Sequence, residues 1–211
     1  MCYNENRMYA KHVAHFVKSY NISWVIKVLI VSDFVIWSAN QLFAPVFAIF
    51  VENNLTGGTI AAIGIASGIY LITKSVFVVP VGRYIDKKRG ETDDLYSAVI
   101  GTAITGVVLL LYTQIDSIVD LYLLQILLGI GGAIAYPGWF SIFTRHVDKD
   151  KQGFEWSLYD VALSGGMAAA AAIGGYLADS LGFNTLFVVA SAATLMGSLL
   201  LLTLRSEMRK K

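Results

Sequence analysis

Six long apolar stretches alternate with polar segments along the chain. Each stretch has close to the roughly 20 residues that a helix needs to cross the hydrocarbon core of a bilayer. The segments between them hold most of the charged residues. The pattern predicts an all-α membrane protein, a bundle of six transmembrane helices. The predicted helices lie at about 24–50, 59–81, 95–113, 118–140, 157–179 and 182–203.

Two short segments flank this predicted transmembrane domain, which extends over 23–204. Residues 1–22 are polar but carry apolar side chains at roughly helical spacing. They are predicted to form either an amphipathic helix on the membrane surface or a partly ordered tail. We do not expect a cleavable signal peptide here, because the first apolar stretch is too long. Residues 205–211 form a basic tail, and together with Met1 they lead us to expect natural chain ends.

The distribution of charge predicts the orientation in the membrane. Only 15% of the 211 residues are charged, against about a quarter in soluble domains. Fourteen of the sixteen Lys and Arg residues lie in the two ends of the chain and in the connections 82–94 and 141–156, while the three short connections hold none. The positive-inside rule therefore predicts cytoplasmic N and C termini, in a multi-pass protein of the cell membrane.

Several classes of function lack support. Cys2 is the single cysteine, which excludes an intrachain disulfide and argues against a thiolate metal site. No phosphate-binding loop, zinc-protease motif or nucleophile-elbow motif occurs. The cations orient the helices and form no basic patch for nucleic acid. We therefore expect no enzyme, no cofactor, no metal and no nucleic-acid partner.

A short charged connection between the second and third apolar stretches carries the most specific motif. Gly82 is expected to let the chain turn as it leaves the membrane helix, and Asp86 is the one acid among four cations within 83–89. The spacing resembles the loop signature between the second and third helices of major facilitator superfamily transporters. The matching residues are Gly82, Arg83, Asp86, Lys87, Arg89 and Gly90.

Two weaker motif matches resemble the same family. The spacing of Gln125, Gly129 and Ala133 resembles the fourth-helix motif, although the family most often has arginine where this chain has Gln125. The glycine pairs at 165–166 and 174–175 resemble the glycine-rich fifth helix of family antiporters, without its proline. The resemblance covers residues 24–203.

This resemblance implies a fold and a function. The chain resembles the N-terminal six-helix half of such a transporter, itself a 3+3 inverted repeat. It implies a half-size secondary-active transporter that moves a small solute by alternating access, coupled to H+ or Na+. Family members have two six-helix bundles, so the expected partner is a second copy in a parallel homodimer or a separate second half. The alternatives are a non-transporting scaffold or accessory subunit, and the N-terminal fragment of a twelve-helix transporter.

Polar residues inside the apolar stretches mark a candidate cavity. Such residues are costly in hydrocarbon and usually face a cavity or a partner helix. They fall on the first, second, fourth and fifth predicted helices, which are the four that line the cavity in the family. The third and sixth are expected outside. The candidate substrate or coupling-ion residues are Asp33, Trp37, Asn40, Gln41, Tyr70, Lys74, Gln125, Tyr136 and Asp160.

Asp33 and Lys74 are the central candidates. Each is six or seven residues from the cytoplasmic end of its predicted helix, about 10 Å deep at 1.5 Å per residue. They are therefore expected to be able to form an ion pair. The functional interpretation makes Asp33 a coupling carboxylate and Lys74 its competitor or an anion contact. The structural alternatives are a static pair that fixes helix packing, or a Lys74 side chain that extends to the interface on its own.

The other candidates have structural interpretations as well. Asp160 is favoured near a helix start by the helix dipole, and Gln125 is favoured as an interhelical hydrogen-bond partner. Small residues four apart predict close helix packing at Gly64 with Gly68 and at Gly129 with Ala133. We also expect Asp86 or Arg83 to contact the region 155–160 of a partner bundle, as the family's loop does.

Overall fold

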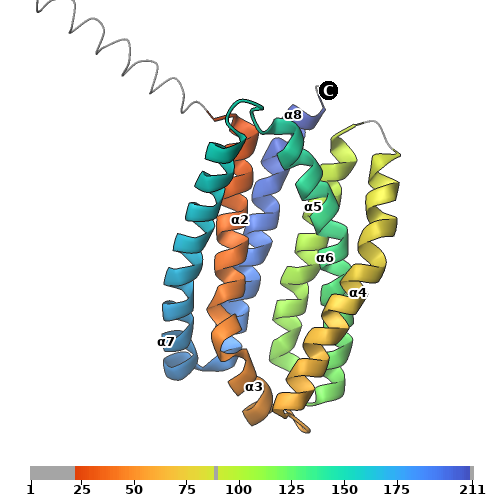
Figure 1. Ribbon diagram of the computed structural model, residues 1–211. Coiled ribbons are helices and arrows are strands. Elements are labelled where there is room, and N and C mark those ends of the chain that lie inside the picture. Colours follow the sequence, from red (N-terminus) through yellow and green to blue (C-terminus); the bar gives the residue numbers. More distant parts are fainter. Residues whose placement is uncertain (1–21, 88–89, 210–211) are drawn as a thin grey trace, which may run out of the picture.

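The computed structural model describes residues 22–87 and 90–209 (Figure 1). The predicted amphipathic segment, apart from Ile22, lies outside the described residues, as do Lys88, Arg89 and the last two residues of the basic tail. Within the described ranges the chain is helical and has no strand, only one isolated bridge between Thr56 and Ser117. The predicted all-α class is confirmed.

The helices follow one another with short connections. They are α2 (Trp24–Phe43), α3 (Phe47–Asn54), α4 (Ile60–Asp86), α5 (Thr92–Leu111), α6 (Ile118–His146), α7 (Gln152–Leu201) and α8 (Arg205–Met208). Short 3-10 turns lie at Ala44–Val46, Tyr112–Gln114 and Leu202–Leu204.

Three of the long helices begin where a hydroxyl side chain caps them. The side-chain oxygens of Ser23, Thr59 and Ser117 each accept a hydrogen bond from the backbone N–H three residues further on, at 3.1–3.3 Å. These bonds satisfy N–H groups that have no partner within the helix. The end of α2 is also determined by nearby sequence, because Pro45 lies in the 3-10 turn that separates α2 from α3. Polar residues at the edges of the apolar stretches thus set the helix starts.

Five helices in the described ranges are long and apolar enough to cross a membrane, with α2 and α3 joined as one span and α7 joined to α8 as another. The α7 helix is broken at Gly182, which adopts φ 81° and ψ 166°. A positive φ is readily available to glycine, and here it lets the chain reverse. Figure 1 shows the two arms of α7 running in opposite directions, with α2 between them in this view. Six crossings result if each arm is one crossing, and that count stays a prediction.

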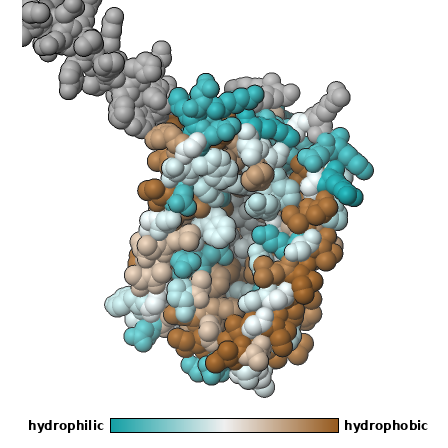
Figure 2. Space-filling view, in the orientation of Figure 1, coloured by the Kyte–Doolittle hydropathy of each residue, from teal (hydrophilic) through white to brown (hydrophobic). Residues whose placement is uncertain are grey.

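Two apolar clusters hold the bundle together, one at each end. The first joins the start of α2 and α5 to the end of α6 and to α8, with Leu29, Leu95, Phe143 and Met208 among its members. The second lies at the opposite end and joins α3, Tyr112, α6 and the α7 turn. Val25 and Met208 share the first cluster, so the first and last described helices meet at one end. Figure 2 shows hydrophilic residues gathered at that end.

Glycines set the closest helix contacts. A Cβ at Gly174 would overlap the backbone carbonyl of Leu42, and one at Gly129 would lie 2.8 Å from the carbonyl oxygen of Tyr70. The predicted close packing at Gly129 is therefore confirmed. The same prediction is wrong within this chain for Gly64 and Gly68, which have no other atom within 4 Å of an added Cβ, because this side of α4 is exposed.

Candidate functional site

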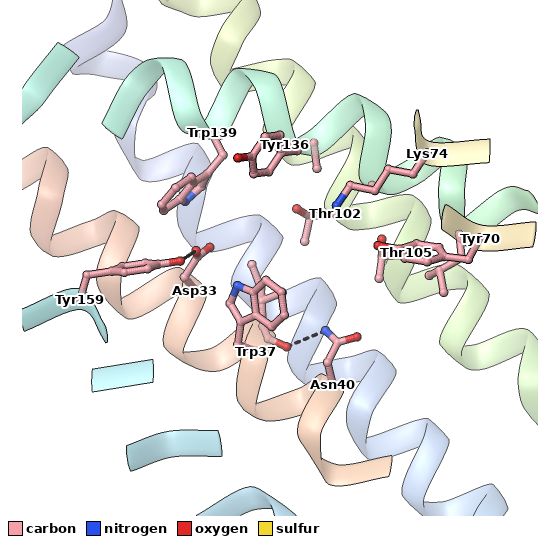
Figure 3. Close-up of a pocket in the computed structure, with 14 residues that line it drawn as sticks. Asp33, Trp37, Asn40, Tyr70, Lys74, Thr102, Thr105, Tyr136, Trp139 and Tyr159 are labelled. Atoms are coloured by element: carbon pink, nitrogen blue, oxygen red, sulfur yellow. Dashed lines mark hydrogen bonds between the residues drawn. The ribbon is translucent and has the colours of Figure 1, made fainter. Parts of the chain in front are cut away.

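A cavity of about 380 Å³ lies between the two apolar clusters. The α2 helix forms one wall, α4 and α6 form the other, and α5 and the first arm of α7 complete it (Figure 3). The same face is hollowed between α2 and α4 in the space-filling view (Figure 2). Its lining consists of Asp33, Ile36, Trp37, Asn40, Tyr70, Lys74, Thr102, Thr105, Leu128, Gly132, Ala135, Tyr136, Trp139 and Tyr159.

Most of the predicted cavity residues meet here. On α2, the spacing of Asp33, Trp37 and Asn40 places them along one side of the helix, and all three line the cavity. Tyr70 and Lys74 enter from α4, and Tyr136 enters from α6. Residues from three separate stretches of sequence thus lie around one space of the size that small-molecule ligands occupy.

Three predicted residues do not line this cavity. Gln125 is buried, and its amide nitrogen donates to the Tyr112 hydroxyl at 3.3 Å, which is the interhelical hydrogen bond that the structural interpretation expected. Asp160 is exposed on α7, and Gln41 is half-buried next to Asn40 but outside the lining.

Asp33 accepts a hydrogen bond from a residue that the sequence analysis missed. The Tyr159 hydroxyl donates to the Asp33 carboxylate at 2.8 Å, and Asp33 is only 7% exposed. This bond joins α2 to the first arm of α7, 126 positions apart in sequence. A carboxylate is costly to bury in an apolar helix bundle, so its placement at the cavity singles Asp33 out.

Lys74 makes different contacts. Its ammonium lies over the rings of Tyr70 and Tyr136, 5.9 Å and 5.2 Å from their centroids. Within residues 22–87 and 90–209 the ion pairs involve other residues, so Asp33 and Lys74 share the cavity without pairing. This geometry does not match a static pair with Asp33. The extension of Lys74 to the membrane interface stays a structural alternative.

The cavity contains residues that sequence reasoning overlooked. Trp139 lies one helical turn after Tyr136, a spacing that was available in the sequence. Tyr159 was passed over for its neighbour Asp160, although Tyr159, Leu163 and Gly166 continue the buried side of α7. The expectation that the third helix lies outside is wrong, because Thr102 and Thr105 of α5 line the cavity.

The charged-connection motif takes a different shape from the one predicted. Gly82 does not turn the chain, since α4 continues through it to Asp86. Gly82 and Asp86 instead line a second hollow of about 400 Å³ beside Pro137 and Ser141 of α6. Arg83 and Lys87 are exposed, Gly90 follows, and Arg89 lies outside the described residues. In the part of the chain that the structure describes, no ion pair involves Asp86.

A separate ionic cluster closes the end of the bundle where α5 begins. The Arg145 guanidinium donates to the fully buried Asp94 carboxylate at 2.7 Å, and Ser141 donates to the same oxygen at 2.9 Å. Glu155 is 1% exposed and accepts from the Asp148 backbone N–H. The described residues include no group of three or more His, Cys, Asp or Glu arranged for a metal ion.

Comparison with known proteins identifies relatives of this sequence. Residues 29–211 match the family described as Major Facilitator Superfamily. The "Uncharacterized MFS-type transporter YitZ" of Bacillus subtilis (strain 168) is 25% identical over 164 residues, which cover 78% of this chain and 96% of that protein. The "Uncharacterized MFS-type transporter MJ1560" of Methanocaldococcus jannaschii is 27% identical over 161 residues, 73% of this chain but only 40% of that protein. No solved structure matches.

Proposed function

Because this chain belongs to the major facilitator superfamily of transporters, we propose that it is a half-size unit of a secondary-active transporter. It moves a small solute across the cell membrane by alternating access, coupled to H+ or Na+. Six crossings with cytoplasmic N and C termini form one bundle. A second bundle, from a parallel copy or a separate half, supplies the other wall of the transport cavity.

The half-open cavity carries this proposal. Trp37 and Tyr136 line it, yet they leave 49% and 50% of their surface exposed. Large aromatic side chains that face a cavity from one side only call for a facing wall. Asp33 on α2 and Lys74 on α4 supply charges at this depth, where ionisable residues generally serve transport.

The charged connection supports a moving contact with the second bundle. Asp86 lies at the rim of the hollow between α4 and α6, and we propose that Asp86 or Arg83 contacts the 155–160 region of the partner. Glu155 is buried in its own bundle, so Asp160, which is exposed, is the acid available for that contact.

The relatives bear on the size of the working unit. YitZ is matched over nearly its whole length, which favours a half-size protein. MJ1560 is more than twice as long as the matched region, which keeps the alternative of a fragment of a longer transporter. A scaffold that retained the fold is the other alternative, and it differs in having no need for a cavity that opens to both sides.

Cavity access tests transport without knowledge of the solute. Cys2 is the single cysteine, so a Cys2→Ser background permits one reporter cysteine at Ala135 in the cavity lining. A membrane-impermeant maleimide should label Ala135→Cys from either side in oppositely oriented vesicles. Val188→Cys, which is exposed on the outside of the second arm of α7, is the control and should stay unlabelled. Labelling of Ala135→Cys from one side only would favour the scaffold.

A further inference from the structure

The Lys74 ammonium is one of the two charges of the proposed transport cavity, and the proposed function assigns it no binding partner. It lies within the membrane-spanning part of α4, where a cation is costly without a counter-charge. The ammonium lies over the ring faces of Tyr70 and Tyr136, which stabilise a cation by only about 0.5–2 kcal/mol. In the described residues it forms no ion pair. We therefore infer that the counter-charge of Lys74 is an anion that enters the cavity from outside the protein.

Asp33 does not fill that role. Its carboxylate accepts from Tyr159 at 2.8 Å and is nearly closed off by the bundle. Figure 3 shows Asp33 and Tyr159 on one side of the cavity and Lys74 with Tyr70 on the other, with Trp37 and Tyr136 between them. The negative group is thus held inside the protein, while the positive group faces the space.

A second donor lies beside the ammonium. The Tyr70 hydroxyl and the Lys74 Cε atom are 3.4 Å and 3.8 Å from the point that a Cβ at Gly132 would occupy. The missing side chain at Gly132 leaves room for both. An ammonium and a phenol hydroxyl that border the same space can each donate to an oxygen of one carboxylate.

Three large aromatic side chains also line the cavity, besides aliphatic, hydroxyl and amide groups. Trp37, Tyr136 and Trp139 present ring surface to a cavity of about 380 Å³, and flat ring faces favour stacking with an aromatic or other planar apolar body. We propose that the transported solute is an organic anion, an aromatic monocarboxylate whose carboxylate binds Lys74 and Tyr70 and whose ring stacks on Trp37 and Tyr136. This inference rests on the proposed function, because it names the solute of that same cavity.

Paired probes test the charge requirement directly. Tryptophan fluorescence quenching, with Trp37 and Trp139 as reporters, measures binding to the protein in bilayer discs. The probes are benzoate, phenylacetate and indole-3-acetate, each compared with its carboxamide, together with benzylamine and phenylalanine. At least one carboxylate should bind ten-fold more tightly than its carboxamide, and benzylamine should bind weakest.

Matched lysine variants assign the effect to Lys74. Lys74→Gln should weaken binding of the carboxylate at least ten-fold and leave the carboxamide unchanged, whereas Lys74→Arg should keep the preference for the carboxylate. Lys27→Gln is the control, since Lys27 also lies in an apolar helix but is exposed outside the cavity. Equal binding of acid and amide, tighter binding of benzylamine or phenylalanine, or no binding by any carboxylate would overturn the inference.

The two proposals fail separately. If a carboxylate binds through Lys74 but Ala135→Cys is labelled from one side only, the anion site is supported and transport is refuted. If Ala135→Cys is labelled from both sides but the cavity prefers amines, transport is supported and the anion site is refuted.

Discussion

Asp33 and Lys74 line one cavity, yet each contacts a different partner. Asp33 is bound by Tyr159 across the α2 and α7 contact, and Lys74 lies against Tyr70 and Tyr136. In the proposed cycle this separation assigns solute recognition to Lys74 and coupling to the ion gradient to Asp33.

We expect Asp33→Asn to uncouple transport. The asparagine oxygen can still accept from Tyr159, so the helix contact survives while the charge is removed. Gradient-driven accumulation of the best-binding carboxylate in proteoliposomes should fall at least ten-fold, and exchange between equal pools should stay within about two-fold. Asp116→Asn, exposed in the connection before α6, should leave both unchanged. Full accumulation by Asp33→Asn would refute a coupling role.

The buried Asp94 depends on Arg145 for stability. Loss of the partner of a buried carboxylate costs about 3–5 kcal/mol, and the 40% exposure of the Arg145 side chain lets water recover part of it. Arg145→Gln should therefore destabilise the protein by about 1–3 kcal/mol, measured by unfolding in detergent.

Two comparisons check this assignment. Asp94→Asn combined with Arg145→Gln should recover part of the loss, because no unpaired charge then remains buried. Lys149→Gln, in the exposed connection before α7, should have no effect. An Arg145→Gln protein as stable as the Lys149→Gln protein would show that the ion pair contributes nothing.

At the level of helices, packing depends on positions where only glycine fits. A Cβ at Gly174 would overlap the Leu42 carbonyl, whereas one at Gly175 meets nothing within 4 Å. Gly174→Ala should lower stability by about 1–3 kcal/mol, because backbone cannot move aside as a side chain can. Gly175→Ala should be neutral or slightly stabilising, since alanine favours helix. Equal melting temperatures for the two variants would contradict the packing of α2 against α7.

Hydropathy and spacing predicted the helical class and most of the cavity. A long apolar stretch indicates a helix in the membrane, and the helical period indicates which residues share one side of that helix. Contacts between helices that are distant in sequence cannot be predicted from one stretch alone. The partner of Asp33 is Tyr159, not the expected Lys74, and Gly82 remains helical because α4 packs along α6. Tyr159 lies one position from the predicted Asp160, a rotation of about 100° that only packing decides.

At the scale of the whole molecule, a single bundle leaves one side of its cavity uncovered. We expect the protein in bilayer discs to have the mass of two 23.0 kDa chains, since a second wall is required for alternating access. A strict monomer would exclude a self-contained homodimer and direct the search to a separate second half.

A cysteine pair tests the arrangement of that dimer. In the Cys2→Ser background, Asp86→Cys combined with Ser157→Cys should give a covalent dimer under mild oxidation, because the end of α4 faces the start of the partner's α7 in the proposed assembly. Asp86→Cys combined with Val188→Cys is the matched control and should stay monomeric, since Val188 is exposed on the second arm of α7. Monomer alone from the first pair would count against this contact.

Val25 and Met208 lie in one apolar cluster, so the described chain enters and leaves its bundle at the same end. A second bundle in the same orientation can be attached by a hydrophilic linker that never crosses the lipid. Duplication of the gene followed by fusion of the copies would give one continuous polypeptide without an extra membrane segment. In such a tandem protein the two cavity walls are free to change independently, so that one can specialise in coupling and the other in solute recognition.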